Sequence, residues 1–481
     1  MRRPLNLISA AAACVFLLGG CSSQVPPEEF VRDGFLPAAG AEETPSGASN
    51  GSVPNGAQTS DTTARGNGGS GTGSNAGPGG GGGGIGSNGS SGGGANAGIA
   101  VRAGSCAGFR NGTGITNSTI TLANASDLSG PVPGLFTSAQ QAAKAYIAYF
   151  NSQTTVCGRK LKLIGYDTQT SSFGDQQAAT SACSSSFAMV GSISAFDSGG
   201  AKTVTDCGIP DLRTLATTPE RIRAPVVYGT DSVNTPQVST IQYRYLKQRY
   251  PNAVTKSALL YLDAGAAVPN AKAYQKTMSA LGYKFLYTQG IDVTALNYVP
   301  YATRMKNLGV KLVQFEGAYQ YAVRLKKAMQ DEGLDAVFVM DSIAYDPSFV
   351  GAGKTLIDGM WSYVDTGLFE EIDRNREMQL YVKWLHQVAP GAKPSFFGMY
   401  AWGAAKLFSE MALGLGGQLT RHNLVVALRG VHNYNANGLF APQDVGGKTT
   451  TGCQTMIQLV NGQWVRRTPY PWSCSTVYDT R

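Results

Sequence analysis

Strand-like runs alternate with helical stretches along this 481-residue chain, and this alternation constrains its fold more than any other feature. The run at 118–127 ends in polar residues, and the stretch at 138–151 then places Ala142, Tyr146 and Tyr149 on one helical face. The remaining elements of this first series are strand-like runs at 160–167, 188–193 and 209–216 and helical stretches at 175–187 and 198–208. This order predicts a parallel sheet with helices on both faces.

The same alternation begins again at residue 256. Its strand-like runs occupy 256–263, 283–291, 310–317, 335–342 and 358–365, and its helical stretches occupy 270–282, 298–309 and 319–333. Longer helices are predicted at 375–388, 397–415 and 420–430, and Asn461-Gly462 predicts the turn of a terminal hairpin. The predicted fold class is therefore α/β, with two doubly wound parallel-sheet lobes. Because the strands end in polar or glycine-rich loops, a ligand is expected at their carboxyl ends.

The beginning of the chain predicts export. Arg2 and Arg3 precede an apolar run that is too short to span a bilayer, so residues 1–20 are interpreted as a signal peptide. Leu18-Gly19-Gly20-Cys21 resembles a bacterial lipobox, in which Cys21 carries a diacylglyceryl anchor after cleavage. An ordinary signal peptide with an accidental cysteine is the alternative. We expect a protein held by a lipid anchor at the extracytoplasmic face of the cell membrane.

Residues 21–98 predict a disordered tether rich in glycine and serine, because 37–96 contains almost no large apolar residue that a core could bury. The globular part is expected to begin near residue 99. Without Arg2 and Arg3 the formal charge falls from +8 to +6, and the remaining basic residues are scattered. This distribution indicates a solvated, mildly basic surface and argues against nucleic acid as a partner.

Cysteine usage agrees with export. Of eight cysteines, Cys14 leaves with the signal peptide and Cys21 is the predicted lipidation site. The other six allow fifteen disulfide pairings, between which the sequence alone does not choose. No CxxC pair is present, which argues against a zinc or thiol-redox site, so no metal or other cofactor is expected.

Enzyme motifs are incomplete. The three histidines, His386, His422 and His432, all come late in the chain, which gives a serine–histidine mechanism little support. The stretch GSISA at 191–195 lacks the final glycine of a nucleophile elbow, and SFVGAGKT at 348–355 has Ser348 where a phosphate-binding loop has its first glycine. The sequence therefore predicts a protein that is not an enzyme.

Several features in unbroken order resemble the type I periplasmic binding proteins, in the branch that binds leucine, isoleucine and valine for ABC importers. These features are Leu128-Ser129-Gly130-Pro131, Gly158-Arg159-Lys160-Leu161, Tyr166-Asp167 and, for the second lobe, the helix–strand–helix at 301–334. The resemblance covers about residues 115–470. It implies a hinge that the chain crosses three times, with lobe 1 at 99–230 and 367–440 and lobe 2 at 231–366 and 441–481.

The resemblance also implies three disulfides and part of a ligand site. The pairs Cys106–Cys157, Cys183–Cys207 and Cys453–Cys474 each stay inside one implied lobe. In the family, the carboxylate of an amino-acid ligand binds on the loop after the third strand. The implied lobe 1 site residues are Ser129, Leu135 and Phe136 from the first loop, Ser194, Ala195, Phe196, Asp197 and Ser198 from the third, and Ala216, Thr217 and Thr218 from the next. A plain turn before Pro219 is the alternative for 216–218.

Asp197 conflicts with a ligand carboxylate, because two such charges 4 Å apart repel by about 4 kcal/mol at an effective dielectric of 20. Either Asp197 turns away from the ligand or the ligand has no carboxylate there. The structural alternative is that Asp197 or Ser198 caps the helix that follows, which stabilises a helix by about 1 kcal/mol.

On lobe 2 the family supplies an acid for the ligand ammonium and a tyrosine that packs on the ligand. The candidates at strand ends are Asp263, Glu316, Tyr319, Asp341 and Ser342. The acids could instead cap helices or remain in water.

The implied function is a monomeric solute-binding protein that captures a small polar ligand, an amino acid or an amide, and delivers it to ABC permease and ATPase subunits. A surface sensor on the same fold is the alternative, and an extracellular hydrolase is a more distant one.

Overall fold

The computed structural model describes residues 101–481. The predicted signal peptide, the lipidation site Cys21 and the predicted tether at 21–98 lie outside the described residues. Among residues 101–481, no helix is both long enough and apolar enough to cross a membrane.

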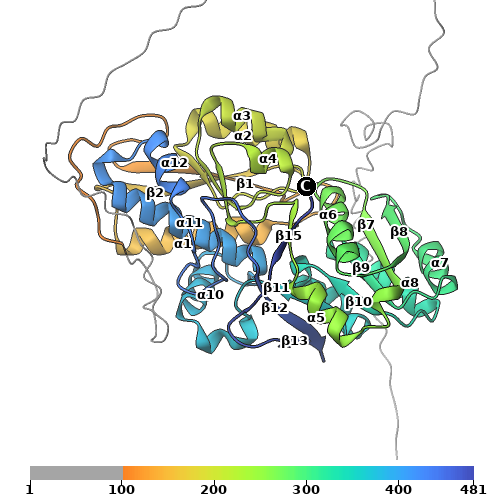
Figure 1. Cartoon of the computed structure of the whole chain (residues 1–481). Helices are drawn as coiled ribbons and strands as arrows, with labels where there is room; N and C mark the ends of the chain where they lie inside the picture. The colour runs from red at the N-terminus through yellow and green to blue at the C-terminus, as the bar shows by residue number, and fades with distance from the viewer. Residues whose placement is uncertain (1–100) are drawn as a thin grey trace, which may run out of the picture. The chain divides into compact units, whose positions relative to one another are not determined.

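The first lobe, which carries the labels β1 and β2 in Figure 1, is built on a five-stranded parallel sheet with the strand order β2-β1-β3-β4-β5. Its strands are β1 (Thr119–Ser126), β2 (Lys160–Asp167), β3 (Ala188–Val190), β4 (Asp211–Leu215) and β5 (Val227–Asp231). The helices that alternate with them are α1 (Thr137–Gln153), α2 (Ser172–Ser185), α3 (Ser198–Cys207) and α4 (Pro219–Arg223). The central strands are buried on both faces, as expected for a sheet covered by helices on each side.

The second lobe is built on a sheet with the order β13-β12-β11-β10-β9-β7-β8, to which β14 is added beside β12. Its parallel strands are β7 (Ser257–Leu262), β8 (Phe285–Ile291), β9 (Leu312–Glu316), β10 (Val337–Met340) and β11 (Trp361–Val364). The antiparallel strands are β12 (Cys453–Val460), β13 (Gln463–Arg466) and β14 (Ser473–Cys474). The helices are α5 (Ile241–Arg249), α6 (Ala267–Ala280), α7 (Val299–Asn307), α8 (Tyr319–Asp331) and α9 (Pro347–Gly353). The predicted fold class, α/β with two parallel-sheet lobes, is confirmed.

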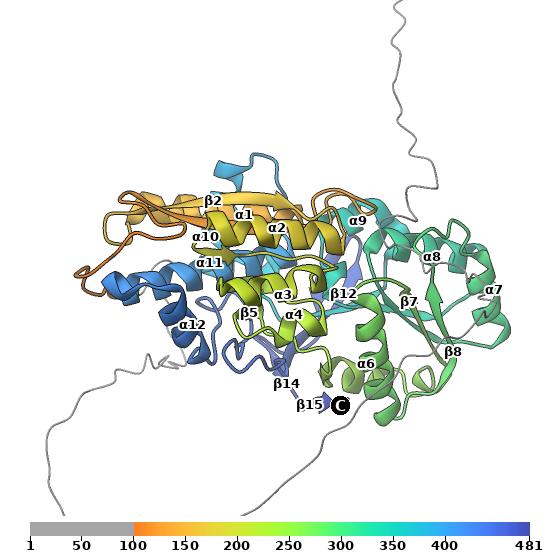
Figure 2. The same ribbon diagram turned by 90° about the horizontal axis from the view of Figure 1, so that it is seen from above.

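After β11 the chain returns to the first lobe, where α10 (Arg376–Val388), α11 (Phe396–Leu415) and α12 (Arg421–Arg429) follow one another (Figure 2). The helix α11 is buried along almost its whole length, because it is mostly apolar and lies between α1 and the sheet, and its buried Lys406 pairs with Glu410 at 3.0 Å. Its Trp402 ring meets the Tyr146 ring of α1 edge to face, with centroids 4.8 Å apart. This helix therefore completes the first core from a distant part of the chain.

Short elements complete the structure. The strands β6 (Gln237–Ser239) and β15 (Val477–Asp479) form an antiparallel pair, which the sequence pattern did not predict. Single 3₁₀ turns lie at Val254–Lys256, Ser342–Ala344, Lys354–Ile357, Phe369–Arg374 and Gly416–Gln418. Three disulfides, Cys106–Cys157, Cys183–Cys207 and Cys453–Cys474, join the pairs that the family resemblance implies.

The chain passes between the two sheets after β5, after β11 and before β12, and one side chain links these three passages. The Gln443 amide oxygen accepts hydrogen bonds from the Ser232 backbone (3.1 Å) and hydroxyl (2.9 Å). Its Nε2 donates to Asp365 Oδ2 at 3.2 Å and to the Tyr400 hydroxyl at 3.1 Å. Gln443 is completely buried, so these bonds have no competition from water.

Two buried carboxyls lie in the same passages. Burial, followed by the charge of nearby Asp365, raises the pKa of Asp231 well above its ordinary value. Burial also raises the pKa of Asp365 to about 6. Asp231 Oδ1 has no hydrogen-bond partner among the described residues. Asp231 is therefore held as a neutral acid, because two charged carboxylates would not be tolerated there.

These pKa values set the sign of a pH effect. Between pH 4 and 7 the folded protein binds more protons at this pair than the unfolded chain does, so the pair makes stability fall as pH rises. Asp231→Asn keeps the shape and the neutral form. We expect it to flatten the pH dependence of the free energy of unfolding between pH 4 and 7 and to leave stability at pH 7 equal or higher. Urea unfolding at several pH values measures this, with the exposed Asp358→Asn as the control. An unchanged pH slope would contradict the assignment.

Candidate functional site

The carboxyl ends of β1, β3 and β4 bring three loops of the first lobe together. Asp127, which follows β1, is completely buried and organises them. Its Oδ2 accepts from the Ala195 N–H at 2.8 Å, and its Oδ1 accepts from the Thr168 hydroxyl. Burial raises the pKa of Asp127, although these hydrogen bonds oppose the rise. Sequence reasoning missed this residue, whose signal was an acid at the end of a buried strand.

Asp197 neither caps α3 nor lies open to a ligand. It stands at the N-cap position, but its side chain makes no capping hydrogen bond, and Ser198 is already the first residue of the helix. The Asp197 carboxylate is completely buried and accepts from the Thr217 N–H (2.8 Å), the Thr218 N–H (3.0 Å) and the Thr218 hydroxyl (2.6 Å). The capping prediction is therefore wrong, and Asp197 turns away into the lobe, where it holds the loop after β4.

Behind these loops lies a cluster of five buried charges, formed by Asp175, Asp197, Asp211, Arg213 and Arg221. Two contacts join Arg213 to Asp197 (3.5 Å) and to Asp211 (3.1 Å). Two more join Arg221 to Asp211 (2.7 Å) and to Asp175 (3.3 Å). Every one of these side chains is 0% exposed. The signal in the sequence was a pair of opposite charges, Asp211 and Arg213, inside an otherwise apolar strand, because charges buried in a sheet must be paired.

The pKa values of the cluster follow from burial and pairing. Burial opposes the charge of Arg213, but Asp211, Asp197 and Asp175 outweigh it and raise the pKa of the guanidinium. Burial alone would raise the pKa of Asp211, but Arg213 and Arg221 outweigh burial and lower it. For Asp175, burial prevails over the two arginines and raises the pKa to about 6. Arg213 therefore stays charged and pairs with Asp197 and Asp211 in the cluster.

The same carboxylates occupy the N–H donors that could bind an anion. Asp127 takes the Ala195 N–H, Asp197 takes those of Thr217 and Thr218, and Asp175 Oδ2 takes the Gly200 N–H at 2.8 Å. A helix start and its neighbouring loops usually offer such groups to a ligand carboxylate. Here most of them are already used inside the protein, which reduces the capacity of this lobe for an anionic ligand.

The other residues predicted on the first lobe occupy different environments. The resemblance implied that Phe136 forms a wall of the site, but Phe136 is buried in the core, where its ring lies 5.0 Å from the Phe397 ring. Leu135 is half-buried. Ser129 is exposed, and its hydroxyl donates to Asp167. Burial opposes the charge of Asp167, but this bond and three backbone N–H groups outweigh burial and lower its pKa.

The loops after β3 and β4 are also tied to each other. Ser194 is buried and its hydroxyl accepts from the Phe196 N–H at 3.2 Å, and its carbonyl accepts from the Thr217 hydroxyl. Thr218 is also the N-cap of α4, because its hydroxyl accepts from the Arg221 N–H. Residues 216–218 therefore make more hydrogen bonds than a plain turn before Pro219 requires. Ala216 is buried, while Ala195 and Phe196 are half-buried.

The loop after β3 touches the second lobe directly. The Ala266 N–H, at the start of α6, donates to the Ala195 carbonyl at 3.2 Å. Gly265 lies so close that a Cβ atom there would be 2.9 Å from the same carbonyl and 3.2 Å from the Phe196 ring. The strand ends of the two lobes therefore meet at Ala195 and Phe196, two residues that the resemblance placed at the ligand.

On the second lobe, the structure brings together Glu316, at the end of β9, and Asp341, after β10. Burial, followed by interaction with Asp341, raises the pKa of Glu316 well above its ordinary value. Burial raises the pKa of Asp341 to about 6. Asn270 Nδ2 donates to Glu316 Oε1 at 3.2 Å, and Asp341 accepts from the Ile343 N–H at 3.2 Å. Asp341 thus also caps the short turn at Ser342–Ala344, one of the alternatives open from the sequence.

Two buried tyrosines, Tyr243 and Tyr363, and the half-buried Tyr274 surround this acid pair. Tyr243, Tyr274 and Tyr363 are each close enough to Glu316 for its charge to raise the pKa of the phenol, after the larger effect of burial. The side chains of Glu316 and Asp341 lie within hydrogen-bonding reach of each other, as do those of Tyr243 and Tyr363. An acid pair that shares a proton is suited to a cationic group from a ligand, which would take the place of that proton.

The remaining predicted residues of this lobe lie around the pair. Asp263 is exposed at the end of β7, and Ser342 is half-buried. Tyr319 is half-buried at the start of α8 and meets the Phe349 ring at 6.0 Å. Among the described residues, no group of three or more histidine, cysteine, aspartate or glutamate side chains could hold a metal ion.

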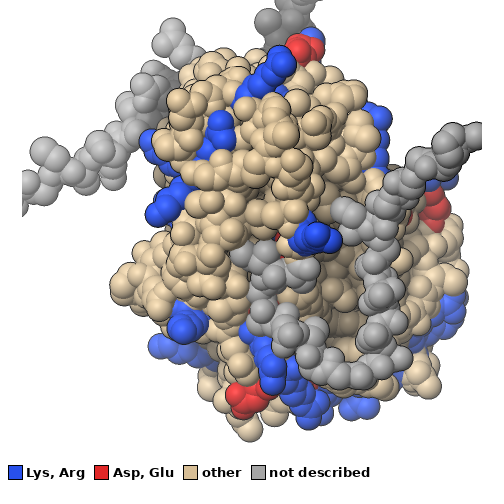
Figure 3. All heavy atoms as spheres, turned by 90° about the vertical axis from the view of Figure 1, so that its left-hand side faces the viewer, with Lys and Arg blue, Asp and Glu red and all other residues tan. Residues whose placement is uncertain are grey.

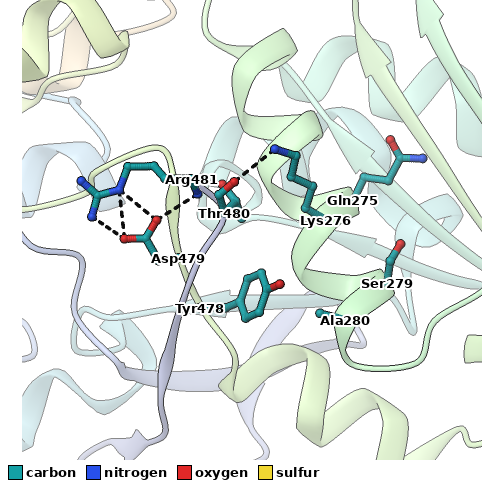
Figure 4. Close-up of a pocket in the computed structure, with 8 residues that line it drawn as sticks. All are labelled: Gln275, Lys276, Ser279, Ala280, Tyr478, Asp479, Thr480 and Arg481. Atoms are coloured by element: carbon teal, nitrogen blue, oxygen red, sulfur yellow. Dashed lines mark hydrogen bonds and ion pairs between the residues drawn. The ribbon is translucent and has the colours of Figure 1, made fainter.

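A separate hollow of about 530 Å³ lies between α6 and the C-terminal strand β15 (Figure 4). Lys276 donates to the Thr480 carbonyl at 3.1 Å across it, and Arg481 pairs with Asp479 on one side. Its lining comes from the later half of α6 and not from the strand ends, so it is not the predicted site. Lysine and arginine side chains are spread over another face in separate groups (Figure 3).

The role of Asp197 can be tested by substitution. Asp197→Ala removes three hydrogen bonds and leaves Arg213 without one of its buried partners, so we expect a loss of about 3–5 kcal/mol in the free energy of unfolding. Urea denaturation measures this. Asp206→Ala is the matched control, because Asp206 is exposed and pairs only with Lys202, and it should cost less than about 1 kcal/mol. Equal effects of the two variants would contradict a structural role for Asp197.

Solved structures share this fold at low sequence identity. A fatty-acid ABC transporter substrate-binding protein from Thermomonospora curvata is 18% identical, with a TM-score of 0.66 over 75% of this chain and 94% of its own. A solute-binding protein from Rhodopseudomonas palustris, in complex with 4-hydroxybenzoate, is 16% identical, with a TM-score of 0.63 over 73% and 96%. A branched-chain amino-acid transporter substrate-binding protein from Streptococcus pneumoniae, in complex with isoleucine, is 15% identical, with a TM-score of 0.62 over 73% and 100%. A search of curated protein sequences found no match.

The sequence itself matches one family model. The family described as periplasmic binding protein matches residues 119–463, which include both sheets and most of the terminal hairpin. This is a family of binding proteins and not of enzymes, as the incomplete enzyme motifs predicted. The chain belongs to the periplasmic binding protein family.

Proposed function

We propose that this protein is a lipid-anchored, extracytoplasmic solute-binding protein of an ABC importer. Family membership and the likeness to transporter-associated binding proteins support this proposal. Cys21 would hold the anchor, residues 21–98 would form the tether, and ABC permease and ATPase subunits would receive the ligand. The lobe limits expected from the sequence, 99–230 with 367–440 and 231–366 with 441–481, are part of the same proposal.

The acid pair formed by the buried Glu316 and the half-buried Asp341 carries the proposal for the ligand. It lies at the strand ends of the second lobe, and Asn270 of α6 donates to it. In the first lobe, four backbone N–H groups at the strand ends and at the start of α3 already bind the carboxylates of Asp127, Asp175 and Asp197. The site therefore favours a small polar ligand with an ammonium or amide group, such as an amino acid or an amide. A ligand whose only charged group is a carboxylate, such as an aromatic or fatty acid, is disfavoured.

Capture would occur by lobe closure. A ligand held by one lobe gains contacts from the other only in the closed state, and this difference in affinity shifts the equilibrium toward closure. The contact from Ala266 to Ala195 supports this mechanism, because it joins the two lobes at the strand ends. A surface sensor would use the same closure to signal to a membrane protein, and it remains the second candidate.

A ligand screen tests the proposal. We expect one class among amino acids, amides, polyamines and small peptides to raise the melting temperature of the protein. Glu316→Gln should reduce the affinity for that ligand at least tenfold, because it removes the charge at the acid pair, whereas the exposed Asp335→Asn should not. Binding of aromatic or fatty acids alone would contradict the proposed ligand class. A response to a protein partner and to no small molecule would favour the sensor.

The acid pair also predicts a pH dependence. Because burial raises the pKa of Asp341 to about 6 and raises that of Glu316 well above its ordinary value, the free pair holds a proton at mildly acidic pH. A cationic ligand binds best to the ionised pair, so its affinity should rise between pH 5 and pH 8, with release of a proton on binding. Calorimetry in two buffers of different ionisation enthalpy measures that proton. An affinity that does not change with pH would contradict the role of the pair.

A further inference from the structure

The strand β8 ends the second sheet on one side, and its outer edge is unpaired in the described chain. The Asp263 N–H donates to the Ile291 carbonyl at 2.9 Å, so Ile291 faces the neighbouring strand β7. Because backbone groups alternate in direction along an edge strand, Gly290 and Thr288 point outward. The Gly290 carbonyl accepts a bond from the adjacent Gln289 side chain at 2.7 Å. The edge therefore presents backbone donors and acceptors to solvent.

This edge lacks the charged residues that usually discourage strand pairing. The edge strand β2 of the first sheet carries exposed Lys160 and Lys162, and β13, at the other end of the second sheet, ends in Arg466. No charged residue lies between Phe285 and Ile291. Exposed apolar side chains lie on or shortly after the strand: Leu286 is 39%, Leu296 is 85% and Val299 is 40% exposed. Such an edge is a template for another strand.

The residues around β8 are complementary to themselves in antiparallel order. If two copies pair about a two-fold axis at Thr288, the Thr288 residues, whose hydroxyls accept from Gln275 of α6 at 3.1 Å, lie opposite each other, and Tyr287 of one copy lies opposite Gln289 of the other. The exposed Lys284 and Asp292 flank the strand at its two ends. Antiparallel pairing brings each lysine toward the aspartate of the other copy, whereas parallel pairing would bring like charges together.

We propose that β8 is a homodimerisation edge, at which the β8 strands of two copies pair antiparallel about a two-fold axis at Thr288. A closed two-fold contact uses one patch on both copies, which this self-complementary strand provides. The Gln289 side chain must release the Gly290 carbonyl when the strands pair. A register shift of β8 against β7, next to Leu286, limits the length of regular pairing, so the dimer is weak. This inference is independent of the ligand and revises the monomer expected from the sequence.

Cysteine cross-linking tests the register. Thr288→Cys places two thiols in a hydrogen-bonded pair whose Cα atoms are about 5.5 Å apart, within the range of a disulfide. Leu286→Cys is the matched control, because its two copies would be about 13 Å apart along the strands. The six cysteines at 101–481 are already joined in pairs. Under mild oxidation of the full-length exported chain, Thr288→Cys should give at least tenfold more covalent dimer than Leu286→Cys. Equal yields, or no dimer from either variant, would overturn the proposal.

Charge exchange provides a second test in the same chain. Sedimentation velocity should show a concentration-dependent dimer for the unmodified protein. Lys284→Glu should weaken it, because the substitution places a second acidic side chain toward Asp292 of the other copy. Asp292→Lys should also weaken it, and the double exchange should restore dimerisation, although Asp292 also holds the local turn by bonds to Thr294. A monomer at every concentration, or a double exchange no better than the single ones, would overturn the proposal.

Discussion

The buried pairing of Arg213 and Arg221 with Asp175, Asp197 and Asp211 is the interaction on which the first lobe depends. These side chains come from β4, from α2, from α4 and from the loop that precedes α3. Because each charge is removed from water, its stability requires its partners, and the loops that supply the partners are held in place. Asp197 also holds the loop after β4, because its carboxylate accepts hydrogen bonds from the backbone N–H groups of Thr217 and Thr218. The loops at the strand ends are therefore rigid parts of the lobe.

The two lobes present different chemical groups at their strand ends. In the first lobe, backbone N–H donors at the strand ends bind the protein's own carboxylates, whereas the second lobe contains the acid pair of Glu316 and Asp341. The direct contact between Ala266 and Ala195 joins these regions. Where the chain passes between the sheets, the Gln443 side chain links segments that are more than 200 residues apart in sequence. Any hinge movement between the lobes must therefore take place around this buried, hydrogen-bonded residue.

Much of the fold could be predicted from the sequence, and less of the site. The alternation of period-two runs with helical stretches predicted both parallel sheets, because local periodicity reports which face each element buries. It missed the edge strand β5, and it missed β6 and β15, since each of these two is a strand of three residues stabilised by a partner about 240 positions away. Strand-end positions predicted the loops at 194–198 and 216–218 as ligand loops, and the structure brings these two loops into contact. Whether a side chain such as Asp197 or Phe136 turns toward a ligand or into the core depends on distant residues that local patterns do not contain.

By itself, the sequence determined that this chain forms two α/β lobes, because the spacing of apolar residues is a local property that each element carries. The tertiary structure decided what the charged residues do. Asp197, which looks like a helix cap or an obstacle to a ligand carboxylate, binds the next loop because folding brings Thr217, Thr218 and Arg213 to it. The electrostatics of a buried group depend on the partners within a few ångströms, and those partners are assembled only when strands far apart in sequence become neighbours.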